Sequence, residues 1–86
     1  MKLYVLAQEL NYENDVKVFE LDLSTEDIMY VENFDNFDDY KSACISAVAY
    51  NVIGNIVVMS EEQFKNFGNI EVTKFVPTRY QIELAS

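Results

Sequence analysis

The residues best able to do chemistry are carboxylates that lie close together in the first half of the chain. No Lys or Arg interrupts this cluster, which consists of Glu26, Asp27, Glu32, Asp35, Asp38 and Asp39. A glycosidase-like acid/base pair needs two carboxyl groups across a cleft, and so many acids would supply such a pair by chance. A calcium loop needs oxygen ligands at alternate positions and a central Gly, which residues 35–39 lack. The cluster therefore predicts no catalytic or metal site, and capping of a helix start is favoured over calcium binding.

Most other catalytic and cofactor chemistry is excluded by residues that the chain lacks. It has no His, which removes the usual general base, the Ser–His and Cys–His pairs and the commonest metal ligand. The single Cys44 lies in an apolar segment and is expected to be a core thiol. Two glycines, Gly54 and Gly68, cannot form a glycine-rich phosphate loop. We therefore expect no enzyme, no cofactor and no structural zinc site, and an enzyme that works with carboxylates alone is the least favoured alternative.

Two interpretations of the acidic cluster remain. It is either a solvated face that keeps a small protein soluble, or a surface that binds a basic partner. Tyr30 and Phe34 are interleaved with the acids and could serve as apolar anchors inside a charged rim. Aromatic residues at such spacing are also typical of a helix face in the core, which is the preferred interpretation for Phe37 and Tyr40. The binding hypothesis thus names the six carboxylates together with Tyr30 and Phe34.

The net charge of −9 lies entirely in the first forty residues, which hold eleven acids and two lysines; the remainder holds four acids and four basic residues. This distribution disfavours direct binding of nucleic acid, which needs a basic face, and binding to an anionic membrane. It favours the basic surface of another protein. If that partner normally binds nucleic acid, the carboxylates could mimic phosphates and block it, as a phage or mobile-element inhibitor of a host system would.

A helix predicted over residues 37–53 is the element around which the rest of the chain is arranged. Asp35 and Asn36 are good N-caps, acids follow in the first turn, and Gly54 is a stop signal. Small and apolar residues dominate from residue 43 onward. The C-terminal half of the helix is therefore expected to be buried on most sides.

Alternation of apolar and polar residues predicts strands on both sides of this helix. Residues 2–10 and 16–23 should form a hairpin through a polar turn at 11–15, and apolar residues on both faces of the first strand indicate an interior position. The strand after the helix could run parallel to a neighbour, and the last two strands should form a second hairpin. These later strands are expected at 56–59, 70–76 and 79–84.

Two short helices complete the prediction. A capping-box pattern that begins at Ser60 predicts one over the residues that follow it. Residues 25–34 are ambiguous between a helix and a strand. Ser24 as an N-cap favours the helix, with Ile28 and Val31 facing inward.

The sequence therefore predicts one small α+β domain over residues 1–86, in the order β-β-(α)-α-β-α-β-β. A largely antiparallel sheet of about five strands would pack on the central helix and one or two short helices, all on one face. No apolar run reaches the roughly 18 residues that a membrane span needs, and no secretory signal is expected. A lone cysteine suits a reducing compartment, so a cytoplasmic location is expected.

A structural or assembly subunit is the alternative function. Val16 and Val18 lie on the otherwise polar face of the second strand, and that face or an open sheet edge could pair with another copy of the chain. This alternative predicts a homo-oligomer that resists salt, whereas binding of a basic partner weakens as salt rises.

Overall fold

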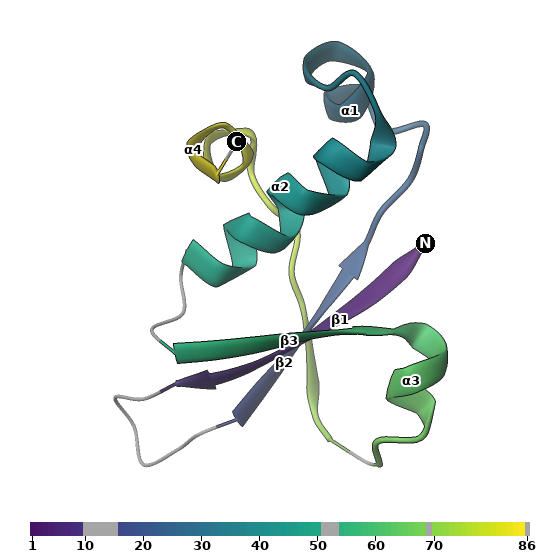
Figure 1. The fold of residues 1–86 in the computed structure, drawn as a ribbon, viewed down its shortest axis with the longest axis vertical. Coiled ribbons are helices and arrows are strands. Elements are labelled where there is room, and N and C mark those ends of the chain that lie inside the picture. Colours follow the sequence, from purple (N-terminus) through teal and green to yellow (C-terminus); the bar gives the residue numbers. More distant parts are fainter. Residues whose placement is uncertain (10–15, 51–53, 69, 86) are drawn as a thin grey trace.

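The computed structural model describes residues 1–9, 16–50, 54–68 and 70–85, which form a mixed sheet and four helices (Figure 1). The strands are β1 (Lys2–Glu9), β2 (Val16–Asp22), β3 (Gly54–Ser60) and β4 (Val72–Lys74). The helices are α1 (Ile28–Asn33), α2 (Phe37–Tyr50), α3 (Glu61–Lys65) and α4 (Arg79–Ala85). The α+β class predicted from the sequence is confirmed.

The sheet has the strand order β3-β1-β2-β4 within the described part of the chain. β1 pairs antiparallel with both β2 and β3; Val5, for example, lies opposite Val58. β2 pairs in parallel with β4, and Val18 is aligned with Val72. The predicted interior position of the first strand is confirmed. The suggestion that the strand at 56–59 runs parallel to a neighbour is wrong, because the parallel pair is β2 with β4.

The main core lies between one face of the sheet and the helices α1, α2 and α4 (Figure 1). Alternate residues of β1 and β2 meet small residues of α2, which let the helix approach the sheet closely. The expected burial of the central helix is confirmed for Ala43, Cys44, Ala47 and Val48. The buried residues of this cluster are Leu3, Val5, Leu21, Leu23, Tyr40, Ala43, Cys44, Val48 and Ile82.

The opposite face of the sheet holds a smaller apolar cluster, made of Tyr4, Val18 and Met59. α3 covers this cluster, and the Phe64 ring stacks on the Tyr4 ring with centroids 4.2 Å apart. The predicted capping box at Ser60 is confirmed: Ser60 Oγ accepts from the Gln63 N–H at 3.2 Å, and Gln63 Oε1 accepts from the Ser60 N–H at 2.9 Å. The helices therefore lie on both faces, and the prediction of a single helical face is wrong.

The predicted strand at 79–84 is in fact helix α4. Its alternating apolar residues fit a strand, but a second capping box starts a helix there. Thr78 Oγ1 accepts from the Gln81 N–H at 3.2 Å, and Gln81 Oε1 accepts from the Thr78 N–H at 2.8 Å. The helix then buries Ile82 in the main core. Local capping thus outweighs the period-two pattern.

The predicted second hairpin is therefore wrong, and the sheet has four strands in the described ranges rather than about five. The strand expected at 70–76 shortens to β4 and joins β2 in parallel. One further hydrogen bond, from the Phe75 N–H to the Glu20 carbonyl at 2.9 Å, extends this pairing before the chain turns away.

Two predicted segments have boundaries that the structure defines only in part. The central helix begins at Phe37 as predicted and continues to Tyr50. Residues 51–53 of that prediction, residue 10 of the first strand and the turn at 11–15 lie outside the described residues.

Candidate functional site

The start of α1 is fixed by one of the predicted site residues. Asp27 is the N-cap, and its Oδ1 accepts from the Met29 N–H at 2.9 Å. Ser24, predicted as this cap, instead accepts from the Glu26 N–H at 3.2 Å in the preceding turn. The helix predicted here is confirmed, but its cap lies three residues later because Asp27 reaches the first free N–H groups.

The start of α2 brings further acids next to α1. Asn36 Oδ1 accepts from the Asp39 N–H at 2.9 Å, and Asn36 Nδ2 donates to Asp39 Oδ2 at 3.1 Å. Asp38 and Asp39 lie in the first helical turn, where the positive end of the helix dipole stabilises negative charge. The favoured capping interpretation therefore holds for Asn36.

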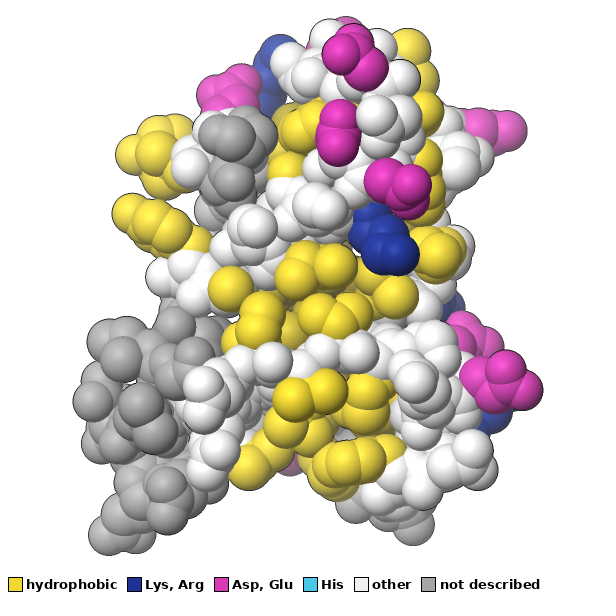
Figure 2. Space-filling model, in the orientation of Figure 1, with side chains coloured by type: hydrophobic (Ala, Val, Ile, Leu, Met, Phe, Trp, Pro, Cys, Tyr) yellow, Lys and Arg dark blue, Asp and Glu magenta, His cyan; other side chains and the backbone are white. Residues whose placement is uncertain are grey.

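The six predicted carboxylates come from α1, from the turns on either side of it and from the first turn of α2, and we call this end of the molecule the acidic end (Figure 1). Figure 2 shows acidic side chains over α1 and the start of α2. Asp27 is half-buried and the other five are exposed. Glu32 Oε2 lies 3.8 Å from Arg79 Nη2, but both side chains are more than half exposed, so this ion pair contributes little to stability. Most of the negative charge at the acidic end therefore faces solvent.

The two predicted aromatic anchors are half-buried and pack against the main core. The ring centroids of Tyr30 and Phe34 lie 5.8 Å and 5.6 Å from that of Tyr40. The centroids of Tyr30 and Phe37 are also 5.8 Å apart. These contacts attach α1 to α2. Phe37 and Tyr40 are in the core region, as preferred from the sequence.

The outward face of α1 carries two apolar residues that were predicted to face inward. Ile28 is 69% exposed and Val31 is 68% exposed. They are three positions apart and so share one face of the helix. The inward prediction is wrong because the larger side chains of Met29, Tyr30 and Phe34 occupy the side toward the core. Comparing the apolar area of the two helix faces would have revealed this orientation.

A buried polar contact lies beneath the acidic end. Burial raises the pKa of Tyr40, and the Cys44 thiol and a hydrogen bond to the Asp27 carboxylate raise it further. Burial also raises the pKa of Cys44. The phenol and the thiol therefore keep their protons near neutral pH, when neither acts as a nucleophile. Asp27 thus combines capping of α1 with an influence on the buried Tyr40 hydroxyl.

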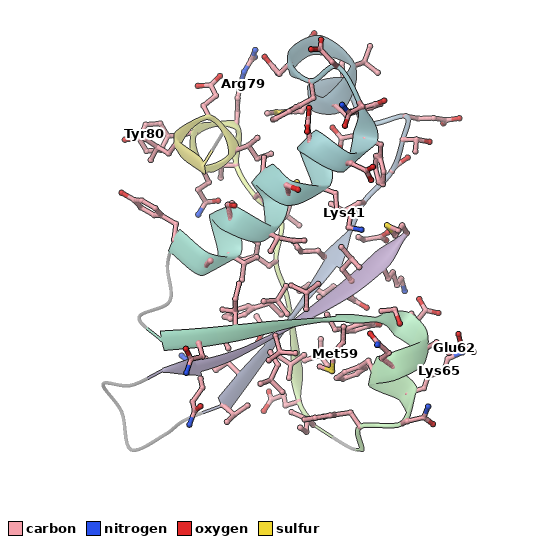
Figure 3. All side chains as sticks on the ribbon, viewed as in Figure 1. Lys41, Met59, Glu62, Lys65, Arg79 and Tyr80 are labelled. Atoms are coloured by element: carbon pink, nitrogen blue, oxygen red, sulfur yellow. The ribbon has the colours of Figure 1, made fainter. Side chains whose placement is uncertain are left out.

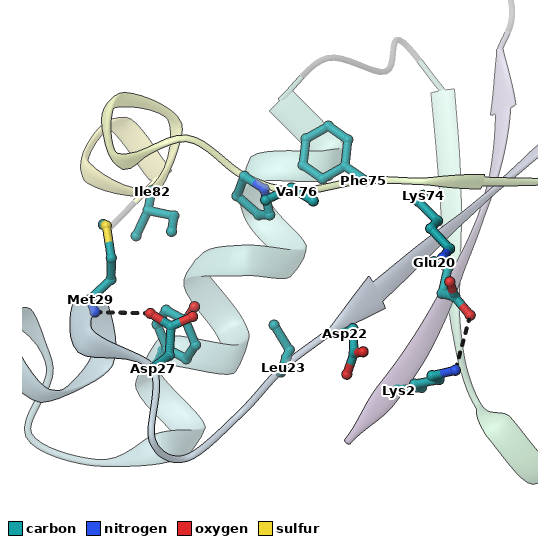
Figure 4. Close-up of a pocket in the computed structure, with 12 residues that line it drawn as sticks. Lys2, Glu20, Asp22, Leu23, Asp27, Met29, Lys74, Phe75, Val76 and Ile82 are labelled. Atoms are coloured by element: carbon teal, nitrogen blue, oxygen red, sulfur yellow. Dashed lines mark hydrogen bonds and ion pairs between the residues drawn. The ribbon is translucent and has the colours of Figure 1, made fainter.

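A pocket of about 170 Å³ lies between the end of β2, the segment after β4 and the start of α1 (Figure 4). Leu23, Met29 and Ile82 form part of its apolar wall. Its polar lining is mixed in charge and consists of Lys2, Glu20, Asp22, Asp27, Tyr40 and Lys74. Glu20 Oε1 already accepts from the Tyr4 hydroxyl at 2.9 Å and lies 3.8 Å from Lys2 Nζ. The sequence did not predict that these residues lie close together, because they come from strands and helices that are distant along the chain. The mixed charge favours no single class of ligand.

The described ranges contain neither a metal-binding cluster nor a membrane-spanning helix. No group of three or more Cys, Asp or Glu side chains there converges as metal ligands do. Among the helices of the same ranges, none is long and apolar enough to cross a membrane.

In comparisons with known proteins, the chain matches no protein family, no curated protein and no solved structure.

Proposed function

We propose that the protein is a non-catalytic interaction protein whose acidic end binds a basic surface on another protein. The observation that carries this proposal is the exposed pair Ile28 and Val31 on α1, a helix flanked along the chain by exposed carboxylates. Apolar residues at the centre of a charged rim are typical of protein interfaces. Ile28 and Val31 thus take the anchor role that the sequence suggested for Tyr30 and Phe34.

The carboxylates would act mainly during the approach of the partner. Charges of one sign on one end of a molecule steer an oppositely charged surface and raise the association rate. A partner that normally binds nucleic acid presents such a surface, and the carboxylates would then occupy the positions of phosphates. The protein would act on that partner as an inhibitor, such as an antagonist made by a phage or mobile element. The buried, free Cys44 suits a reducing compartment, so the proposed place of this encounter is the cytoplasm.

The test compares two charge reversals of equal size. The variant Asp35→Lys/Asp38→Lys changes the acidic end, and Glu61→Lys/Glu62→Lys changes the first turn of α3, where Glu62 is labelled in Figure 3. Both variants change the net charge by the same amount and place new positive charge at or next to a helix N-terminus. Each protein is immobilised, exposed to lysate of the source cell or its host, and eluted in steps of rising salt. The proteins released at each step are identified and then titrated as pure components.

We expect one basic protein to bind the wild type and the α3 variant and to leave at moderate salt. Its affinity for the acidic-end variant should fall about tenfold or more, mainly through slower association. A second variant, Ile28→Ser/Val31→Ser, should instead speed dissociation, because it removes apolar contact and no charge. Equal affinity of the partner for both charge-reversed variants would contradict the proposal.

A further inference from the structure

The outer edge of β3 lacks the features that usually protect an edge strand. β3 is the end strand of the sheet, and no other strand of the described residues pairs with its outer edge. Its seven residues contain no charge and no Pro, although 24% of the chain is charged. Natural proteins usually protect such edges with Lys, Pro, bulges or very short strands, because unpaired N–H and C=O groups invite a further strand.

Apolar side chains lie on both sides of this edge. Val57 is 54% exposed on the face that carries α3, where its neighbour on β1 is Leu6. Val58 is 39% exposed on the face that carries α2, beside the half-buried Ile56. Figure 2 shows hydrophobic side chains above and below the line of β3. A strand that pairs here therefore gains backbone hydrogen bonds and apolar contacts on both faces.

We propose that β3 pairs antiparallel with β3 of a second copy, around a two-fold axis at Val57, and so forms a homodimer. Val57 then lies opposite Val57 of the second copy, and Ile56 lies opposite Val58. β-branched residues opposite one another are favourable cross-strand pairs. The two four-stranded sheets join into one sheet of eight strands, with both α2 helices on the same side.

The symmetry of the strand selects a second copy as the occupant. Residues that face each other in this register differ by an even number of positions along β3. In a strand, the N–H and C=O groups of every second residue point to the same edge. Residues that face each other across the axis therefore both point their N–H and C=O groups toward the partner strand, or both point them away from it. The sequence is also nearly symmetric about Val57, with one β-branched residue on each side. A basic partner gains nothing at this uncharged edge, and the acids nearest to β3 along the chain that follows it, Glu61 and Glu62, come four and five positions after Val57.

The size of the contact indicates its strength. A single pair of short strands with a few flanking side chains is smaller than the roughly 1,600 Å² of a standard interface. We therefore expect a dissociation constant in the micromolar range. This dimer does not depend on the proposed binding of a basic partner, since it uses a different surface.

The first experiment is sedimentation equilibrium over a range of protein concentrations at low and high salt. The wild type should dimerise, and more strongly at high salt, because salt screens repulsion between two chains of net charge −9. Binding of a basic partner should respond to salt in the opposite direction, so failures of the two proposals are distinguishable. Val57→Lys should abolish the dimer, whereas Val76→Lys, the same change at an exposed valine outside β3 and the acidic end, should preserve it. A monomer at every concentration, or a dimer that survives Val57→Lys, would overturn the proposal.

The second experiment tests the register by disulfide formation. In Val57→Cys the two Cα atoms would lie about 4.5–5.5 Å apart across the axis, within the range of a disulfide. In Val58→Cys the equivalent atoms would lie about 8 Å apart, which is too far. Native Cys44 is buried and stays out of the reaction. Fast, intermolecular cross-linking of Val57→Cys alone supports the two-fold axis, and equal cross-linking of both variants would overturn it.

Discussion

At the scale of single residues, Tyr40 connects the acidic end to the core. Its ring contacts Tyr30 and Phe34 on the α1 side, and the Asp27 carboxylate contributes to its raised pKa. The sequence placed Tyr40 in the core because of its helical spacing from Phe37. It did not reveal the role of Asp27, since a carboxylate in an acidic run resembles its solvated neighbours until its contacts are known.

The buried phenol predicts a loss of stability in alkali. Burial raises the pKa of Tyr40 above its ordinary value of 10 in the folded protein. Above about pH 10 the folded state retains a proton that the unfolded state loses. The free energy of unfolding is therefore unaffected by this group below about pH 10, and above it falls by about 1.4 kcal/mol per pH unit. Tyr40→Phe should remove this part of the slope of unfolding free energy, measured with urea from about pH 9 to about pH 11.

The exposed tyrosine of α2 provides the control for this measurement. Tyr50→Phe removes a hydroxyl that faces solvent, so its slope should equal that of the wild type. Tyr4 and Cys44 also have raised pKa values, the first mainly through its hydrogen bond to Glu20 and the second through burial. Tyr40→Phe should therefore leave some alkaline loss. A wild-type slope in Tyr40→Phe would show that the phenol is not shielded as described.

At the scale of elements, local signals predicted more than long-range ones did. The Ser60 capping box predicted α3 from four residues of sequence. The same pattern at Thr78 and Gln81 starts α4 in the structure, whereas the alternation in the residues that follow led to the prediction of a strand. The parallel pairing of β4 with β2 could not be predicted, because a three-residue strand has no pattern that identifies its partner.

The capping box of α4 leads to a prediction about stability. Thr78→Ala removes the side chain that accepts from the Gln81 N–H, so it should lower the free energy of unfolding by about 1 kcal/mol. Thr78→Ser retains the hydroxyl and should cost only a small fraction of that amount. Urea denaturation followed by circular dichroism measures both. If Thr78→Ala were as stable as the wild type, the cap would not stabilise α4.

At the scale of the whole molecule, the acidic end and the open edge of β3 are separate surfaces. The acidic end gathers negative charge over α1 and the start of α2, while β3 presents an uncharged edge. Composition predicted the charge asymmetry, because it follows from counting residues. It could not predict that the open edge is β3, since strand order depends on contacts between distant segments.

The concentrated negative charge predicts that salt stabilises the protein. Like charges on one end repel in the compact state, and counterions screen that repulsion. Raising NaCl from about 20 mM to about 500 mM should increase the free energy of unfolding by about 0.5–1 kcal/mol. Asp35→Asn/Asp38→Asn should reduce this gain more than Glu61→Gln/Glu62→Gln does, in urea titrations of dilute protein. An equal gain in both variants would show that the repulsion is not localised at the acidic end.

The direct passage from β3 into α3 fixes the register of β3 on β1. Ser60 is both the last residue of β3 and the N-cap of α3, with no loop between them. Four successive apolar residues, Ile56 to Met59, leave the alternation of β3 unable to distinguish one register on β1 from the next. A slip by one residue would carry the cap along and pull Phe64 off Tyr4, on which it stacks at 4.2 Å. The short helix α3 therefore specifies the register of β3, which the apolar sequence of the strand does not specify by itself.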